Sequence, residues 1–226
     1  APVEVGIMDI PAARARRRHD RATVVGLPAI LTQRRIHNGR QAGVLGVGCG
    51  SLHQFVGVQA AVAVDGLRSG RRMSHVFVLD VPAYDRLLLV TDAAVNIAPD
   101  LDTKRDIVQN AIDLAHALGI AAPLVAILSA AETVNPGIPS TVDAAALCKM
   151  ADRGQITGGV LDGPLAFDNA VSVDAARQKG IVSNVAGRAD ILVTPDLEAG
   201  NILAKQLSYF AGADSAGIVM GARCPI

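Results

Sequence analysis

The sequence predicts an α/β fold, with a mostly parallel sheet and helices on both of its faces. From residue 74 onward, short runs rich in Val, Ile and Leu alternate with longer segments of helical periodicity, which is the pattern of β-α-β units. The composition is that of a globular protein with a large aliphatic core, because 50% of the 226 residues are hydrophobic and only 19% are charged.

The first predicted elements are two strands and a long helix. Strands are expected at residues 74–80 and 87–91, and they can pair as a hairpin across a turn that carries Pro82 and Asp85. A helix is expected at residues 102–119, where apolar residues recur at helical spacing. Asp102 is the candidate cap at its start and Gly119 at its end.

Strands and helices then alternate to the end of the chain. Strands are expected at residues 124–128, 156–161, 189–194 and 216–220, and helices at 140–153, 173–179 and 198–210. The helix at 140–153 follows a loop that contains Asn135-Pro136-Gly137, and Gly154 closes it.

Residues 1–65 lack this alternation and form a separate, poorly patterned N-terminal part. Eight arginines oppose three acidic residues over positions 1–50, although the whole chain carries 21 basic and 21 acidic residues. The balanced total excludes a whole-molecule attraction to nucleic acid or anionic membranes. The arginines indicate either a solvated surface or an RNA- or membrane-binding arm, and the lack of aromatic stacking residues favours the surface.

Other patterns exclude several classes of protein. No uninterrupted apolar stretch approaches the length of about 20 residues that spans a bilayer. Three cysteines without metal-ligand spacing, and no secretory signal in residues 1–10, predict a reducing, cytoplasmic setting. His53 and His75 have no partner at metal-ligand spacing, so no metal site is predicted. The glycines of GVLGVGCGS make a poor dinucleotide fingerprint, and no P-loop or nucleophile elbow is present.

Four loops follow predicted strands, at residues 129–140, 162–172, 195–201 and 221–226. Ligands bind beyond the carboxyl ends of strands in open α/β sheets, where free N–H groups at helix starts attract anions. Any one of these loops can be an ordinary turn, but the four together predict one crevice that binds an anion.

Several side chains in or near this crevice are candidates for chemistry. Capping explains one of Asp196 and Glu198, and for Glu198 capping and function are equally open. One of Arg68, Arg71 and Arg72 can hold a phosphoryl group through bidentate hydrogen bonds, with the other two solvated.

The stretch 66–226 closely resembles the phosphate acetyl/butyryltransferase family, and phosphate butyryltransferases most of all. The resemblance is carried by the runs TDAAVNIAPDL, KMADRGQITGG, DGPLAFDNA and PDLEAGN. It implies a two-lobed fold related to the isocitrate and isopropylmalate dehydrogenases, with the active site between the lobes. It also implies reversible transfer of a short acyl group between coenzyme A and inorganic phosphate, without a metal or redox cofactor, in a homodimer or larger homo-oligomer.

The resemblance also assigns site residues. Cys49-Gly50-Ser51-Leu52-His53 is similar to a family segment that has lysine in place of Cys49. We expect Arg68 to bind phosphate as the catalytic arginine, and Ser51 and His53 to bind the acyl phosphate. The loops of Ser129, Asp162 and Asn201 are expected to shape the cleft for coenzyme A. Glu198 is also expected to bind substrate. The sequence stops before a Ser-Arg segment that follows the last strand in the family, so the 66–226 region is expected to be truncated there.

The sequence leaves two other functions open. An isocitrate-dehydrogenase-like oxidoreductase would share the fold, but the missing nucleotide fingerprint and the DGPLAFDNA and PDLEAGN runs speak against it. A non-catalytic acyl-CoA-binding remnant is the alternative from another class. The expected partners are acyl-CoA and phosphate, with no nucleic acid and no membrane.

Overall fold

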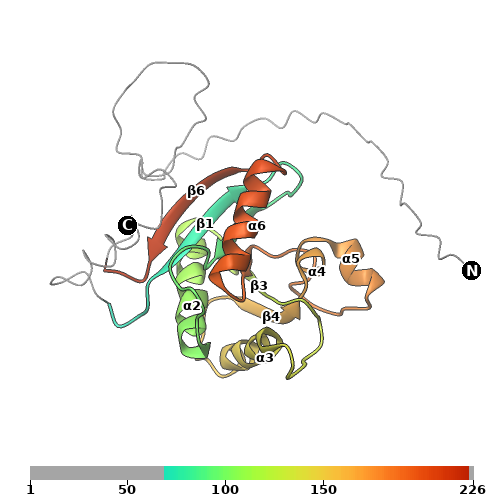
Figure 1. Cartoon of the computed structure of the whole chain (residues 1–226), viewed down its shortest axis with the longest axis horizontal. Helices are drawn as coiled ribbons and strands as arrows, with labels where there is room; N and C mark the ends of the chain where they lie inside the picture. Colours follow the sequence, from blue (N-terminus) through green and yellow to red (C-terminus); the bar gives the residue numbers. More distant parts are fainter. Residues whose placement is uncertain (1–68, 224–226) are drawn as a thin grey trace, which may run out of the picture. The chain divides into compact units, whose positions relative to one another are not determined.

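A computed structural model describes residues 69–223 of the chain, so the predicted N-terminal part at 1–65 lies outside the described residues. Six strands form one sheet in the order β4-β3-β5-β2-β1-β6 (Figure 1). Their bounds are β1 (Ser74–Asp80), β2 (Leu87–Thr91), β3 (Leu124–Leu128), β4 (Val160–Leu165), β5 (Ile191–Val193) and β6 (Asp214–Met220).

The sheet is mixed, with a parallel part and an antiparallel part. β4, β3, β5 and β2 are parallel to one another. β1 runs antiparallel to both of its neighbours, β2 and β6. Val76 lies opposite Thr91 and Asp80 opposite Leu87, which confirms the predicted hairpin.

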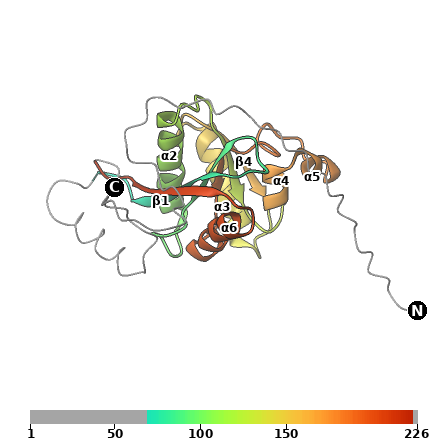
Figure 2. The ribbon, with the colours of Figure 1, turned by 90° about the horizontal axis from the view of Figure 1, so that it is seen from above.

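Helices cover both faces of the sheet, as predicted. Val125 and Ile127 of β3 pack in one core with α2 (Leu101–Ala117) and α3 (Pro139–Asp152). Ala126 and Leu128 point to the other face, because successive side chains of a strand alternate. That second core holds residues of α4 (Phe167–Val171), α5 (Val173–Gln178) and α6 (Leu197–Tyr209). Figure 2 shows α2 and α6 on opposite sides of β1 and β6.

The start of α2 corrects one prediction. Asp100, not Asp102, is the N-cap, and its side chain accepts a hydrogen bond from the N–H of Thr103 at 2.9 Å. Asp102 lies within the first turn, where a carboxylate interacts favourably with the helix dipole. Gly119 follows the helix with φ +88, the left-handed conformation expected of a glycine at this position.

The bounds of β4 correct a second prediction. The strand begins at Val160 and not at 156, because Gly158 turns the chain with φ +86. It also continues through Asp162-Gly163-Pro164, a sequence typical of a turn. Pairing of Ala126 with Asp162 and of Leu128 with Leu165 holds this segment extended, and a register shift between the two pairs accommodates Pro164.

Two further features of the described residues bear on function. The short helix α4 was missed by sequence reasoning because five residues are too few to show helical periodicity. Within residues 69–223, no helix combines the length and the apolar character that crossing a membrane requires.

Candidate functional site

The carboxyl ends of four parallel strands lie along one edge of the sheet. The chain leaves the sheet there after Thr91, Leu128, Leu165 and Val193. β6 points the same way, since both it and β2 are antiparallel to β1. The predicted loops therefore converge on one edge in the described part of the chain, although residues 224–226 fall outside it.

The loop after β2 is built around the buried carboxylate of Asp92, which is 2% exposed. One carboxylate oxygen accepts hydrogen bonds from the N–H groups of Ala94 and Val95, at 3.0 and 3.1 Å. The other oxygen accepts from the backbone of Asn96 at 2.9 Å. Because protein N–H groups solvate its charge, Asp92 fixes the loop from within and does not face a ligand.

Contacts from β5 and α6 hold the same loop. The hydroxyl of Thr194 lies 3.1 Å from the carbonyl oxygen of Asp92, and the amide of Asn201 donates to the carbonyl of Ala93 at 3.2 Å. A Cβ atom on Gly200 would lie 2.5 Å from the carbonyl oxygen of Asp92, so only glycine allows this approach. The loop after β2 and the first turn of α6 therefore form one packed unit.

The start of α6 is acidic. Asp196 caps the helix by accepting a hydrogen bond from the N–H of Ala199 at 2.8 Å. Glu198 is exposed, and no hydrogen bond or ion pair involves its carboxylate in the described part of the chain. The N–H of Leu197 is occupied by the carbonyl of Ile97. Capping thus explains Asp196, and the role of Glu198 stays open.

The start of α3, unlike that of α6, is not acidic. Its N-cap, Ile138, makes no side-chain hydrogen bond, and the first turn contains no acidic residue. The hydroxyls of Ser129, after β3, and Ser140, in the first turn of α3, lie 2.8 Å apart. α2 begins with Asp100 and Asp102, and α6 with Asp196 and Glu198. Among the long helices that begin at this edge, α3 is therefore the one that suits an anion.

A buried ion pair fixes the position of α3. Lys104 on α2 is 6% exposed and donates its Nζ to Asp143 on α3 at 2.7 Å. The pair joins the beginnings of the two helices, so the hydroxyl groups at the start of α3 are held by a firm scaffold.

A polar cluster lies beside this start, on the loop after β3 and the helices after β4. Glu132 accepts hydrogen bonds from the Lys179 ammonium at 2.6 Å and from the Asn169 amide. The Lys179 bond lowers the pKa of Glu132. Asn169 is fully buried, and its Oδ1 has no hydrogen-bond partner. The cluster ties the end of α5 to the 129–140 loop.

Two of the three candidate arginines lie in the described residues. Arg71 is held by Asp113 and Asn110 on α2, so an ion pair already occupies its guanidinium. Arg72 is exposed, and its charge interacts with the Asp100 carboxylate at the start of α2. Arg68, the arginine chosen from the resemblance, lies outside the described residues, as do Ser51 and His53.

The structure brings some predicted residues together and moves one away. Ser129, Glu198 and Asn201 all lie at the carboxyl edge. Asp162 was predicted to begin a loop, but it lies inside β4, and its carboxylate accepts the N–H of Gly163. Sequence reasoning missed Asp92, although an Asp directly after a buried strand is the available signal.

Among residues 69–223, neither a reactive thiol nor a cluster of metal ligands is found at this edge. Cys148 is unpaired and half-buried in α3, and burial raises the pKa of its thiol to about 12. In the stretch 69–223, no group of three or more His, Cys, Asp or Glu side chains is placed to hold a metal ion.

The chain is similar to known acyltransferases. Phosphate acetyltransferase of Rhizobium meliloti is 65% identical over 178 residues, which cover 78% of this chain and 56% of that protein. Phosphate butyryltransferase of Clostridium acetobutylicum is 50% identical over 161 residues, which cover 71% of this chain and 54% of that protein. The chain thus spans about half the length of the curated relatives it matches.

Solved structures and a family model agree with these relatives. The crystal structure of a branched-chain phosphotransacylase from Enterococcus faecalis matches with a TM-score of 0.66 at 38% identity, covering 70% of this chain and 56% of that one. The phosphate acetyl/butaryl transferase model matches residues 21–226, nearly the whole chain. The chain belongs to the phosphate acetyl/butaryl transferase family.

Proposed function

We propose that the protein is a phosphate acyltransferase, which transfers a short acyl group reversibly between coenzyme A and inorganic phosphate. The observation that carries the proposal is the family match over residues 21–226. Relatives named phosphate acetyltransferase and phosphate butyryltransferase support it. Neither of these two relatives is named as a dehydrogenase, which the oxidoreductase alternative would lead one to expect. The oxidoreductase alternative is therefore not favoured.

The physical demand of this reaction is to bring two anions together and stabilise the oxyanion that forms between them. A phosphate oxygen attacks the thioester carbonyl, and the coenzyme A thiolate leaves; the reverse reaction uses the same intermediate. Hydroxyl donors at a helix start with no acid in its first turn meet this demand, and the start of α3 with Ser129 and Ser140 offers them. We assign this helix start to a phosphate-bearing part of the substrates.

The remaining assignments follow the family resemblance. Arg68 would bind inorganic phosphate, and Ser51 and His53 would bind the acyl phosphate. Asn201 and Glu198 would line the coenzyme A side. We also propose Asp162 for the coenzyme A side, although it lies within β4, three residues before the end of the strand.

The wider proposals concern setting and assembly. The acyl group moves between coenzyme A and phosphate without any change of oxidation state, so the reaction needs no redox cofactor. Coenzyme A acts as a substrate, and we propose no further cofactor. We propose a cytoplasmic homodimer or larger homo-oligomer, and a two-lobed fold related to the isocitrate and isopropylmalate dehydrogenases.

The test is a thiol-release assay with acetyl-CoA or butyryl-CoA, with and without inorganic phosphate. Thiol release that depends on phosphate is expected. Arg68→Ala should abolish the phosphate dependence, and Arg177→Ala is the control because Arg177 is an exposed arginine on α5 that pairs with Asp174 of the same helix. A thermal shift with coenzyme A but no turnover would favour the non-catalytic binding remnant, and reduction of NAD with isocitrate would favour the oxidoreductase.

A further inference from the structure

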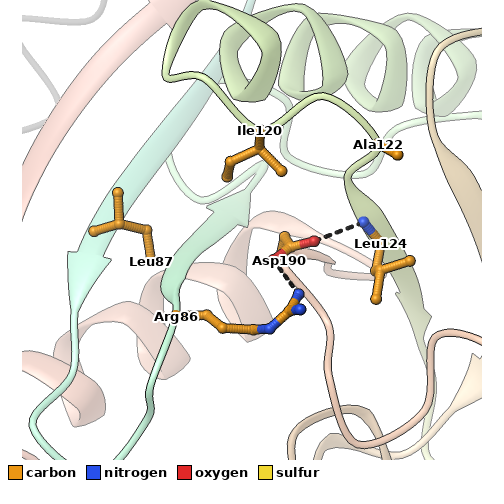
Figure 3. A pocket seen from close by; sticks show the side chains of 6 residues that line it. All are labelled: Arg86, Leu87, Ile120, Ala122, Leu124 and Asp190. Carbon is orange, nitrogen blue, oxygen red and sulfur yellow. Dashed lines mark hydrogen bonds and ion pairs between the residues drawn. The ribbon is translucent and has the colours of Figure 1, made fainter.

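A hollow lies at the edge of the sheet opposite to the candidate site. It has a volume of about 430 Å³ and is formed at the amino ends of β2, β3 and β5. The lining residues are Arg86, Leu87, Ile120, Ala122, Leu124 and Asp190 (Figure 3). In Figure 3 the four aliphatic side chains lie beside and above Asp190, and Arg86, which directly precedes β2, reaches that carboxylate.

Both oxygens of the carboxylate in the hollow accept a hydrogen bond from the protein. Asp190 is 4% exposed; one oxygen accepts a hydrogen bond from Arg86 Nη1 at 2.6 Å, and the other accepts the N–H of Leu124 at 2.8 Å. Asp190 therefore joins the starts of β2 and β3, with each of its two oxygens bonded to one of them.

In the described residues, the guanidinium of Arg86 makes hydrogen bonds through one of its three nitrogens. Arg86 Nη1 donates to Asp190 and to the carbonyl of Arg188, at 2.6 and 3.1 Å, so both of its hydrogens are occupied. No partner is assigned to Nε or Nη2 among residues 69–223, and the side chain is 40% exposed. These two nitrogens form the planar fork that binds a carboxylate through two hydrogen bonds.

The walls of the hollow are aliphatic. Leu87 is 41% exposed, and Ile120 and Leu124 are only partly buried, so the protein leaves apolar surface in water beside the fork. The small side chain of Ala122 leaves room between them. A ligand that is apolar along its length and anionic at one end would cover this surface and occupy the fork.

We propose that this hollow binds a short-chain aliphatic carboxylate, with the carboxylate on the free fork of Arg86 and the chain against Leu87, Ile120 and Leu124. The proposal does not rest on the proposed acyl transfer, because the hollow lies at the opposite edge of the sheet and binding does not require turnover. A ligand of this size in a partly open hollow is expected to bind at about millimolar concentration.

The test is saturation-transfer NMR on the full chain with hexanoate, and with hexylamine and hexanol as matched ligands of the same length. Transfer to the hexanoate methylenes is expected to exceed transfer to either control. Arg86→Gln should weaken hexanoate binding about tenfold, which corresponds to the loss of a charged hydrogen bond. Arg177→Gln removes an exposed arginine on α5 and should leave binding unchanged.

A second variant guards against a folding effect, since removal of Arg86 leaves a buried carboxylate without its partner. Ala122→Phe fills the hollow from an exposed position and leaves the ion pair intact, so it should abolish binding. The proposal is overturned if hexylamine binds as well as hexanoate, if Ala122→Phe still binds, or if no transfer is seen well above about a millimolar. Displacement of hexanoate by coenzyme A or phosphate would place it at the carboxyl edge and would equally overturn the proposal.

Discussion

The hydroxyl of Thr194 lies 3.1 Å from the carbonyl oxygen of Asp92, a residue 102 positions away in the sequence. Each residue directly follows its strand, Asp92 after β2 and Thr194 after β5. Because β2 and β5 are parallel neighbours, this contact closes the gap between two adjacent strand ends. It makes the loop after β2 and the start of α6 one unit at the candidate site.

Thr194→Val should therefore destabilise the protein. Thr194 is 3% exposed, and valine matches its shape while leaving the carbonyl of the buried Asp92 without its hydroxyl donor. We expect a loss of about 1–2 kcal/mol in the free energy of unfolding, measured in urea. Thr133→Val is the control, since Thr133 is exposed in the loop after β3. Equal unfolding midpoints for the two variants would contradict the role given to Thr194.

Gly200→Ala should be destabilising although alanine is the better helix former. Alanine at an ordinary helical glycine gains about 1 kcal/mol. Here the added Cβ would lie 2.5 Å from the carbonyl oxygen of Asp92 and 2.7 Å from Thr194 Oγ1, so β2 and α6 must separate. Thermal unfolding should show a lower midpoint for Gly200→Ala. Gly70→Ala, where an added Cβ meets nothing within 4 Å, should leave the midpoint unchanged.

The two ion pairs of α3 offer a matched comparison of burial. Lys104 with Asp143 has side chains 8% and 28% exposed, whereas Lys149 with Asp152 has side chains 65% and 63% exposed. Lys104→Met should cost about 1–3 kcal/mol of unfolding free energy, because Asp143 loses its partner in a poorly hydrated place. Lys149→Met should change stability by less than about 0.5 kcal/mol. Similar losses in chemical denaturation would show that burial does not decide the difference.

Much of the fold could be predicted because its pattern is local. β3 lies at residues 124–128, as expected from its apolar run, and Gly119 and Gly154 end α2 and α3 with positive φ. The errors arose where tertiary pairing overrides local preference. The turn-like sequence at Gly163 and Pro164 is extended in β4 because β3 pairs with the residues on either side.

The candidate site was less predictable for the same physical reason. The convergence of loops follows from strand direction, which the alternation of elements predicts. Which side chains face inward depends on contacts between distant segments. Asp92 buries its carboxylate among the N–H groups of its own loop, and Asn201 reaches the carbonyl of Ala93, 108 positions away. The Asn201 contact has no signal in the sequence, whereas the position of Asp92 directly after a buried strand is the one available signal for its turn.

Stability should depend on pH through His75. Burial lowers the pKa of His75 from its usual 6.5, and the nearby Asp92 carboxylate partly opposes the shift. The unfolded chain therefore takes up a proton at a higher pH than the folded protein. Stability should fall as the pH drops below about 6.5, by up to about 1.4 kcal/mol per unit, until the folded-state pKa is reached.

Urea unfolding at about pH 7.5 and about pH 5.5 measures this effect. The loss of unfolding free energy between the two should be smaller in His75→Gln than in the unaltered protein. A pH dependence unchanged in His75→Gln would remove His75 as its source.

Ser129→Ala tests the part of the proposed function that assigns phosphate to the start of α3. The hydroxyl of Ser129 lies 2.8 Å from that of Ser140, at a helix start with no acid in its first turn. If a phosphate group binds there, loss of one hydroxyl donor should weaken binding roughly tenfold. The readout is KM for phosphate and for acyl-CoA in the thiol-release assay, or calorimetric affinity for coenzyme A where turnover is too slow.

Ser208→Ala is the matched control, because the Ser208 hydroxyl bonds within α6, to the carbonyl of Ala204. A change in unfolding midpoint with unaltered KM and affinity would mean that Ser129 supports the helix start and does not bind substrate.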